Sequence, residues 1–211
     1  MIRISAKGLA NYMTSGDARK RKILRDYKFP DPEGAVQAKY YAEARRVIEK
    51  YHSGGNDASI IVSAVDELNT KAARAEGNKQ ARLRNNIRGL ESYLRNFGRR
   101  KVTVLATPNM KYERGQVIVS AYPDLYVKDG ERHKIIKLDL GKTPANPQMI
   151  RIVLQVTYAA AQAANLPVLP KDIIYVEVER GTQHSGASRK ARLMRDIEAA
   201  CQTIEDVWPK L

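Results

Sequence analysis

Two apolar stretches joined by a tight turn constrain the fold of this 211-residue chain more than any other feature of its sequence. Residues 117–126 and 133–140 are rich in β-branched, aliphatic and aromatic side chains, and the turn sequence Lys-Asp-Gly-Glu separates them. An Asp-Gly pair supplies the positive-φ residues that a tight hairpin needs. The sequence therefore predicts two antiparallel strands, paired as a hairpin, at the centre of the fold.

Each of these predicted strands carries one carboxylate. Asp124 follows Pro123, and Asp139 stands between two leucines. Two acids on neighbouring strands can share one hard divalent cation, and such a cation is the usual reason for placing them together. The other interpretation is that both acids face solvent at the ends of their strands. The sequence leaves both interpretations open.

The charge of the chain indicates a polyanionic partner. Lysine and arginine total 37 against 23 acidic residues, a formal net charge of +14. Such an excess favours nucleic acid. We expect DNA, although basicity alone is equally compatible with RNA or with an acidic protein. Cys201 is the only cysteine, and the first residues lack the apolar core of a secretory signal, so we expect a cytoplasmic protein. No run of about 18 apolar residues predicts a membrane span.

The basic residues gather in two stretches. Residues 71–101 contain ten basic residues and two acids, an imbalance that predicts a phosphate-binding surface. A second run, at 19–22, is either a phosphate-contacting arm or a solvated face. The residues predicted to bind nucleic acid are Arg82, Arg84, Arg88, Arg95, Arg99, Arg100 and Lys101, together with Arg19, Lys20, Arg21 and Lys22.

The order of elements predicts a mixed α/β (α+β) fold. Helical periodicity covers 35–51, 58–76 and 79–97, and it changes to strand-like runs at Lys101. We therefore divide the chain into a basic helical region, 1–100, and an α/β core, 101–211. In the core we predict a four-stranded mixed sheet with helices at 147–165 and 187–208 and a polar loop at 182–186. The four predicted strands lie at 102–106, 117–126, 133–140 and 173–179.

Residues 101–208 resemble the core of the PD-(D/E)xK nucleases, and most of all the RecB-type branch. Pro123-Asp124 resembles the first half of the family motif and Asp139 the second half. Gln155 and Tyr158 resemble the helix motif that follows the third strand in that branch. The resemblance implies a restriction-endonuclease-like sheet, a Mg²⁺ or Mn²⁺ ion held by Asp124 and Asp139, and cleavage of phosphodiesters. It also implies that Gln155 and Tyr158 position the phosphate or the acid pair.

One departure from the family pattern bears on activity. The family places a lysine two residues after the second acid, where this chain has Gly141. Side chains two apart on a strand point to the same face, so Lys137 shares a face with Asp139 and is one substitute. Lys142 is the other, if the chain bends back at Gly141. His133 shares that face too. Glu177 and Glu179 point one way on the fourth strand and could add a metal ligand, but we predict that they are solvated acids on an exposed strand.

Two functions follow from this pattern. The first is a metal-dependent nuclease in which Lys137 or Lys142 replaces the usual lysine. The alternative is a catalytically inactive protein of the same fold that binds nucleic acid or a protein partner. The acid pair favours the first function, and Gly141 favours the second.

Overall fold

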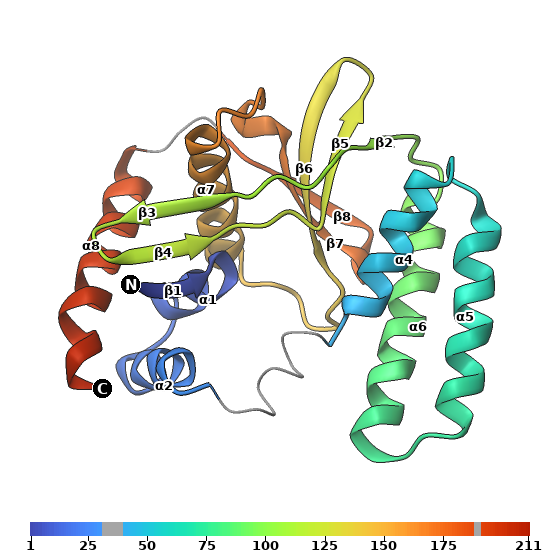
Figure 1. Cartoon of the computed structure of the whole chain (residues 1–211), viewed down its shortest axis with the longest axis horizontal. Helices are drawn as coiled ribbons and strands as arrows, with labels where there is room; N and C mark the ends of the chain where they lie inside the picture. The colour runs from blue at the N-terminus through green and yellow to red at the C-terminus, as the bar shows by residue number, and fades with distance from the viewer. Residues whose placement is uncertain (31–39, 188–190) are drawn as a thin grey trace.

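A computed structural model describes residues 1–30, 40–187 and 191–211 of the chain. The protein has a mixed α/β fold in which two mixed sheets are flanked by helices (Figure 1). Seven α-helices lie in the described part of the chain. They are α1 (Ala6–Met13), α2 (Asp17–Lys28), α4 (Ala42–Ser53), α5 (Ala58–Ala73), α6 (Gly77–Phe97), α7 (Pro147–Ala163) and α8 (Ala191–Val207).

The larger sheet contains five strands in the order β2-β5-β6-β7-β8. Only the β6–β7 pair is parallel, and α7 makes the crossover between those two strands. The predicted hairpin is confirmed, because β5 pairs antiparallel with β6 and Gly130 adopts a φ of 61° in the turn between them. The strands are β2 (Thr103–Val104), β5 (Leu125–Asp129), β6 (Arg132–Asp139), β7 (Ile173–Glu177) and β8 (Thr182–Ser185).

The smaller sheet corrects the prediction of one continuous strand over residues 117–126. That stretch contains β4 and the start of β5. Strand β4 belongs to a separate sheet of order β1-β4-β3, whereas β5 belongs to the five-stranded sheet. The chain changes sheets at residues 121–124, where Pro123 has no N–H to donate to a ladder. The strands of this sheet are β1 (Ile2–Ser5), β3 (Lys111–Arg114) and β4 (Val117–Ser120).

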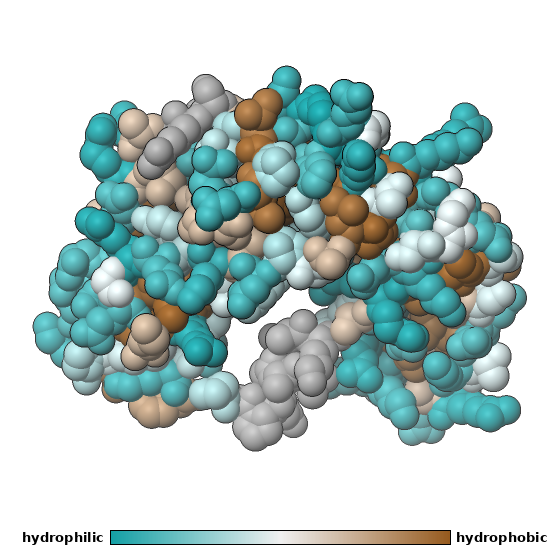
Figure 2. All heavy atoms as spheres, turned by 45° about the horizontal axis from the view of Figure 1, so that its top comes forward, coloured by the Kyte–Doolittle hydropathy of each residue, from teal (hydrophilic) through white to brown (hydrophobic). Residues whose placement is uncertain are grey.

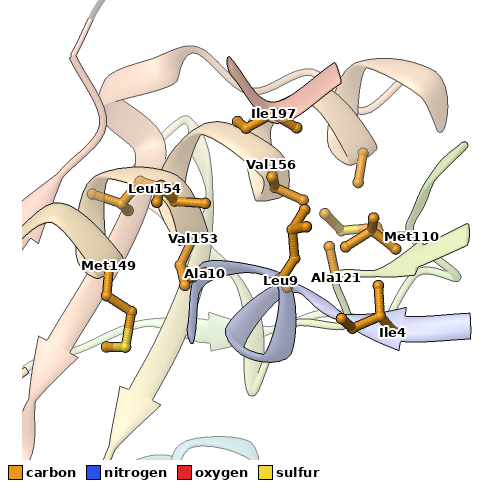
Figure 3. Close-up of a cluster of buried hydrophobic side chains, with 14 of the residues drawn as sticks. Ile4, Leu9, Ala10, Met110, Ala121, Met149, Val153, Leu154, Val156 and Ile197 are labelled. Carbon is orange, nitrogen blue, oxygen red and sulfur yellow. The ribbon is translucent and has the colours of Figure 1, made fainter. Parts of the chain in front are cut away.

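Two apolar cores lie on opposite faces of the five-stranded sheet, because successive side chains of a strand point to opposite faces. Ile135 and Tyr175 contribute to one core, which joins the sheet to α1, α7 and α8. Ile136 and Val176 contribute to the other, which joins the sheet to α4, α5 and α6. In Figure 3 the first core brings together Leu9 of α1, Val156 of α7 and Ile197 of α8, each fully buried.

The N-terminal segment belongs to the first core and not to the helical side of the molecule. Strand β1 pairs parallel with β4, and Leu24 of α2 is buried in the same core as α7. Residues 2–28 therefore pack against the second half of the chain, whereas α4, α5 and α6 pack together on the opposite face of the sheet (Figure 1). This packing places α1 and α4 on different sides of the end of β6.

Several further predictions differ from the structure at the level of single elements. The five-stranded sheet replaces the predicted four-stranded one, and the predicted loop at 182–186 contains the edge strand β8. The last predicted strand ends at Glu177, and Glu179 lies in a short 3₁₀ turn. The predicted start of the first long helix, at Ala35, lies outside the described residues. The helices predicted at 58–76, 79–97 and 147–165 are confirmed within a few residues at each end.

Helix α7 begins where the sequence predicts it. Asn146 is the N-cap and its side-chain oxygen accepts a hydrogen bond of 2.8 Å from the N–H of Gln148, while Pro147 occupies the first helical position. Both features fix the start of the crossover helix next to the end of β6. No helix in the described part of the chain is long and apolar enough to cross a membrane.

Candidate active site

Asp124 and Asp139 lie at the same end of the β5–β6 hairpin. Asp124 immediately precedes β5, and its N–H donates a hydrogen bond of 3.0 Å to the carbonyl of Ile136. Its carboxylate Oδ2 accepts a bond of 2.8 Å from the N–H of Leu138, so backbone and side chain are both fixed to β6. Asp139 is the last residue of β6, one position beyond Leu138. The register of the hairpin therefore brings together two acids that are 15 positions apart in the sequence.

Two cations neutralise Asp124, whose side chain is 11% exposed. The Nε of Arg45, from α4, lies 2.7 Å from Oδ1, and the Nζ of Lys137, from β6, lies 3.1 Å from Oδ2. Lys137 also donates a hydrogen bond of 2.6 Å to the carbonyl of Tyr122. Among the described residues, the buried Nε of Arg45 makes no aligned hydrogen bond despite the short distance. Its contact with Asp124 is therefore mainly electrostatic.

Asp139 has a different set of partners. The hydroxyl of Tyr175 donates a hydrogen bond of 2.6 Å to Oδ2, and the N–H of Gly141 donates one of 3.1 Å to Oδ1. The Nζ of Lys7, from α1, lies 3.7 Å from Oδ1. Burial raises the pKa of Tyr175, and the negative charge of Asp139 raises it further, so the phenol keeps its proton and remains a donor.

Glu177 is a third carboxylate, and it lies next to Asp139. It stands opposite Asp139 on the parallel neighbour β7 and is buried, so the prediction of a solvated acid is wrong. It accepts hydrogen bonds from the N–H of Ala145 (2.9 Å) and the hydroxyl of Thr182 (3.2 Å), and its Oε2 lies 2.8 Å from Nε2 of His184. Burial alone would raise the pKa of Glu177, but these contacts outweigh it and lower the pKa. Glu177 is therefore ionised at neutral pH and ties β7, β8 and the start of α7 together.

The acid pair has the ligand chemistry that Mg²⁺ or Mn²⁺ requires. Both are hard cations, and Mg²⁺ is usually held in proteins by one or two carboxylates plus water and substrate phosphate oxygens. Asp124 and Asp139 supply two such carboxylates, each with one oxygen fixed by a backbone N–H. The side chains of Arg45 and Lys137 also contact Asp124, and those of Lys7 and Tyr175 contact Asp139, so a metal ion would have to displace some of these contacts. Within the described residues, no cluster of three or more His, Cys, Asp or Glu side chains could hold a metal.

The other sequence-predicted site residues lie at different distances from the acids. Lys142 is exposed, and no ion pair joins it to either acid in the described part of the chain. His133 stands at the far end of β6, where its Nδ1 lies 2.6 Å from the hydroxyl of Tyr126. Gln155 and Tyr158 line two cavities, of about 360 and 520 Å³, between α7 and α8, and neither acid lines these cavities.

The predicted basic surface is partly committed to internal contacts. Arg88 forms an ion pair with Glu179, and Arg100 donates a hydrogen bond to Gln183. Arg84, Arg95 and Arg99, in α6 and the turn after it, are exposed, although Arg95 also donates a hydrogen bond of 3.1 Å to Ser92. Arg82 is partly exposed and Lys101 is exposed.

The run at 19–22 lies in helix α2, with Arg19 and Arg21 exposed, Lys20 paired with Asp17 and Lys22 paired with Asp26. The face shown in Figure 2 is mostly hydrophilic.

Sequence reasoning missed three residues of the site, namely Lys7, Arg45 and Tyr175. Tyr175 carries a signal, because alternation along β7 places it on the same face as Glu177. Lys7 and Arg45 carry none, since each belongs to a helix whose approach to the sheet depends on tertiary packing.

Comparison with known proteins adds no relative. A scan against models of protein families finds no match for this chain, and a search of the curated proteins finds no match either. The function is therefore inferred from the geometry of the site.

Proposed function

We propose that the protein binds nucleic acid and hydrolyses phosphodiester bonds with Mg²⁺ or Mn²⁺ held by Asp124 and Asp139. The observation that carries the proposal is the convergence of two carboxylates and a lysine at one end of the sheet, with Lys137 3.1 Å from Asp124. Acids that serve only solubility are exposed, whereas these two are 11% and 12% exposed.

The order of elements supports a nuclease-like fold of the PD-(D/E)xK type. An antiparallel hairpin, β5–β6, carries the acids, and α7 then crosses over to β7, which is parallel to β6. This is the order of elements that the resemblance implies for residues 101–208, with the small sheet and the edge strand β8 as additions.

Each group near the acids has a defined part in the proposed chemistry. A bound Mg²⁺ or Mn²⁺ would polarise the phosphate and lower the pKa of an attacking water. Asp124 and Asp139 hold that ion, and their backbone hydrogen bonds keep the carboxylates in place. Lys137 keeps Asp124 oriented through its bonds to that acid and to the Tyr122 carbonyl. Lys142, Gln155 and Tyr158 complete the predicted set, and their roles remain predictions.

The substrate is expected to approach along exposed arginines. Arg84, Arg95 and Arg99 lie on the α6 side, and Arg19 and Arg21 on the α2 side. Because phosphates attract such side chains regardless of sequence, these contacts set affinity and its salt dependence. Direct base contacts would have to come from other residues.

One observation favours the alternative, a non-catalytic protein that binds nucleic acid or a protein partner. Three cations, Lys7, Arg45 and Lys137, already neutralise the two acids. Such a neutralised cluster can hold α1, α4 and β6 together without binding a metal ion. The position of the usual lysine is Gly141, which agrees with that alternative.

A cleavage assay separates the two functions. Purified protein is incubated with linear, nicked and single-stranded DNA and with RNA, in Mg²⁺, in Mn²⁺ and in EDTA. The variants are Asp124→Ala, Asp139→Ala and a control, Asp129→Asn, which removes the charge of an acid of the same hairpin that pairs with Lys134 and keeps a residue suited to the turn. We expect metal-dependent cleavage by wild type and the control, and none by the other two variants.

Each outcome points to one function. Equal cleavage by wild type and Asp124→Ala would mean a contaminant or another site and would overturn the proposal. If the wild-type protein binds DNA or RNA but neither it nor any variant cleaves them, the non-catalytic alternative is favoured.

A further inference from the structure

Gly141 lies directly beside the carboxylate of Asp139. A Cβ built at Gly141 would meet only Asp139 Oδ1 among the described residues, at 3.2 Å, so that oxygen would have to shift by a few tenths of an ångström to admit a side chain. The glycine does not have a positive φ, so its backbone conformation is open to other residues. Position 141 therefore contributes no side chain next to Asp139, although the backbone does not require a glycine there.

Lys7 approaches the same oxygen from another element. Its Nζ lies 3.7 Å from Asp139 Oδ1, and its side chain is 57% exposed, so the ammonium group can move onto a bound anion. The backbone beneath it is fixed. The side chain of Ser5 caps α1 by accepting a hydrogen bond of 3.0 Å from the N–H of Gly8, and Leu9 and Ala10 are fully buried in the first core.

The other lysines near the site are less suited to contact a substrate. Lys137 is 24% exposed, and its ammonium already binds Asp124 and the carbonyl of Tyr122. Lys142 is exposed and has no ion pair with either acid in the described part of the chain. Of these three lysines, Lys7 alone is both paired with Asp139 and largely open to solvent.

We propose that Lys7 is the catalytic lysine of this site and replaces, from helix α1, the side chain that Gly141 lacks. This inference rests on the proposed phosphodiesterase function. In the reaction, the oxygen of water bonds to phosphorus as the bond from phosphorus to the leaving oxygen breaks, and the proton of the water passes through solvent to that leaving oxygen. Lys7 stays protonated throughout and donates a hydrogen bond to the non-bridging oxygen on which negative charge grows.

The test compares Lys7→Ala with Lys111→Ala, a control outside both basic stretches. Lys111 is 54% exposed and forms an ion pair of 2.6 Å with Glu113, so the control removes a lysine of similar exposure that pairs with a different acid. Single-turnover cleavage at saturating DNA is expected to fall about 10²-fold in Lys7→Ala, as for loss of one transition-state donor, and to be unchanged in Lys111→Ala. The double variant Lys7→Ala/Gly141→Lys is expected to recover at least tenfold, because a lysine at 141 starts beside the same oxygen.

Mn²⁺ affinity, measured by calorimetry on protein without nucleic acid, provides a second readout. Lys7→Ala should bind Mn²⁺ as tightly as wild type or more tightly, because a positive charge next to Asp139 is gone. Weaker Mn²⁺ binding in this variant would mean that Lys7 only orients the acid and would overturn the assignment.

The failures of the two proposals are distinguishable. If wild type cleaves, Asp124→Ala does not, and Lys7→Ala cleaves normally, the phosphodiesterase function stands and the assignment of Lys7 is wrong. A wild-type protein that cleaves nothing would overturn both proposals together.

Discussion

The substitution Asp124→Asn tests whether the acid pair is embedded in a neutralising cluster. An asparagine keeps the volume and can still accept the hydrogen bond from Leu138, but it leaves Arg45 and Lys137 without an anion. A surface ion pair contributes about 0–1 kcal/mol, and breaking a fully buried one costs about 3–5 kcal/mol. The acid is 11% exposed and its partners are 33% and 24% exposed, so the loss lies between these limits.

We therefore expect Asp124→Asn to lower the free energy of unfolding by about 2–3 kcal/mol, which corresponds to roughly 4–12 °C in Tm for a chain of this length. The assay is urea denaturation in EDTA, with Asp26→Asn as the control. Asp26 pairs with Lys22 at 3.2 Å, but both side chains are more than half exposed, so the change should stay within about 0.5 kcal/mol. Unchanged or increased stability of Asp124→Asn would refute the reasoning, because it would mean that the acids repel each other more than the cations attract them.

Three further predictions concern charge and pH. Reversing Arg84, Arg95 and Arg99 to Glu should flatten the dependence of log affinity for duplex DNA on log salt, by roughly 0.9 for each phosphate that is no longer neutralised, in a fluorescence titration. Burial lowers the pKa of His52 from 6.5, so the free energy of unfolding should fall as pH drops below about 6.5. Denaturation curves at pH 5–8 should show a smaller fall for His52→Gln. The lowered pKa of Glu177 contributes stability above pH 4.5 that is lost as pH falls through the folded pKa, and Glu177→Gln should remove that loss in acid titrations.

The signs of the two pH predictions follow from proton binding. The unfolded chain takes up a proton on His52 at a higher pH than the folded protein does, because burial disfavours the charged ring. The stability that neutral His52 contributes is therefore fully present above about pH 6.5. The unfolded chain also protonates Glu177 before the folded protein does, so both groups destabilise the fold on acidification, but in different pH windows. A rise in stability of wild type between pH 7 and 5 would contradict this role of His52.

The sequence predicted the centre of the fold because its signals there are local. Asp129-Gly130 fixes the turn, alternation along β6 fixes which side chains share the face of Asp139, and Asn146-Pro147 fixes the start of α7. The hairpin register then places Asp124 next to β6 without further information. These are short-range features, and no distant part of the chain is needed to specify them.

The missed elements depend on partners far away in the chain. Strand β1 has four residues, and a strand that short is stable only through its pairing with β4. Strand β8 is polar and lies at the edge of the sheet, so it lacks the apolar alternation that marks an inner strand. For the same reason, Lys7 and Arg45 could not be assigned to the site, because only packing of α1 and α4 on opposite sides of the sheet brings them to the acids (Figure 1).

A crystal of the protein soaked in Mn²⁺ tests most directly whether the acid pair binds a metal ion. We expect an anomalous peak between Asp124 and Asp139, about 2.1 Å from one carboxylate oxygen of each, with the side chains of Arg45 and Lys7 moved away from those oxygens. A crystal of Asp139→Ala, soaked in the same way, should lack the peak. Absence of the peak in wild type at millimolar Mn²⁺, with Arg45 still 2.7 Å from Asp124, would contradict the claim that this acid pair is a metal site.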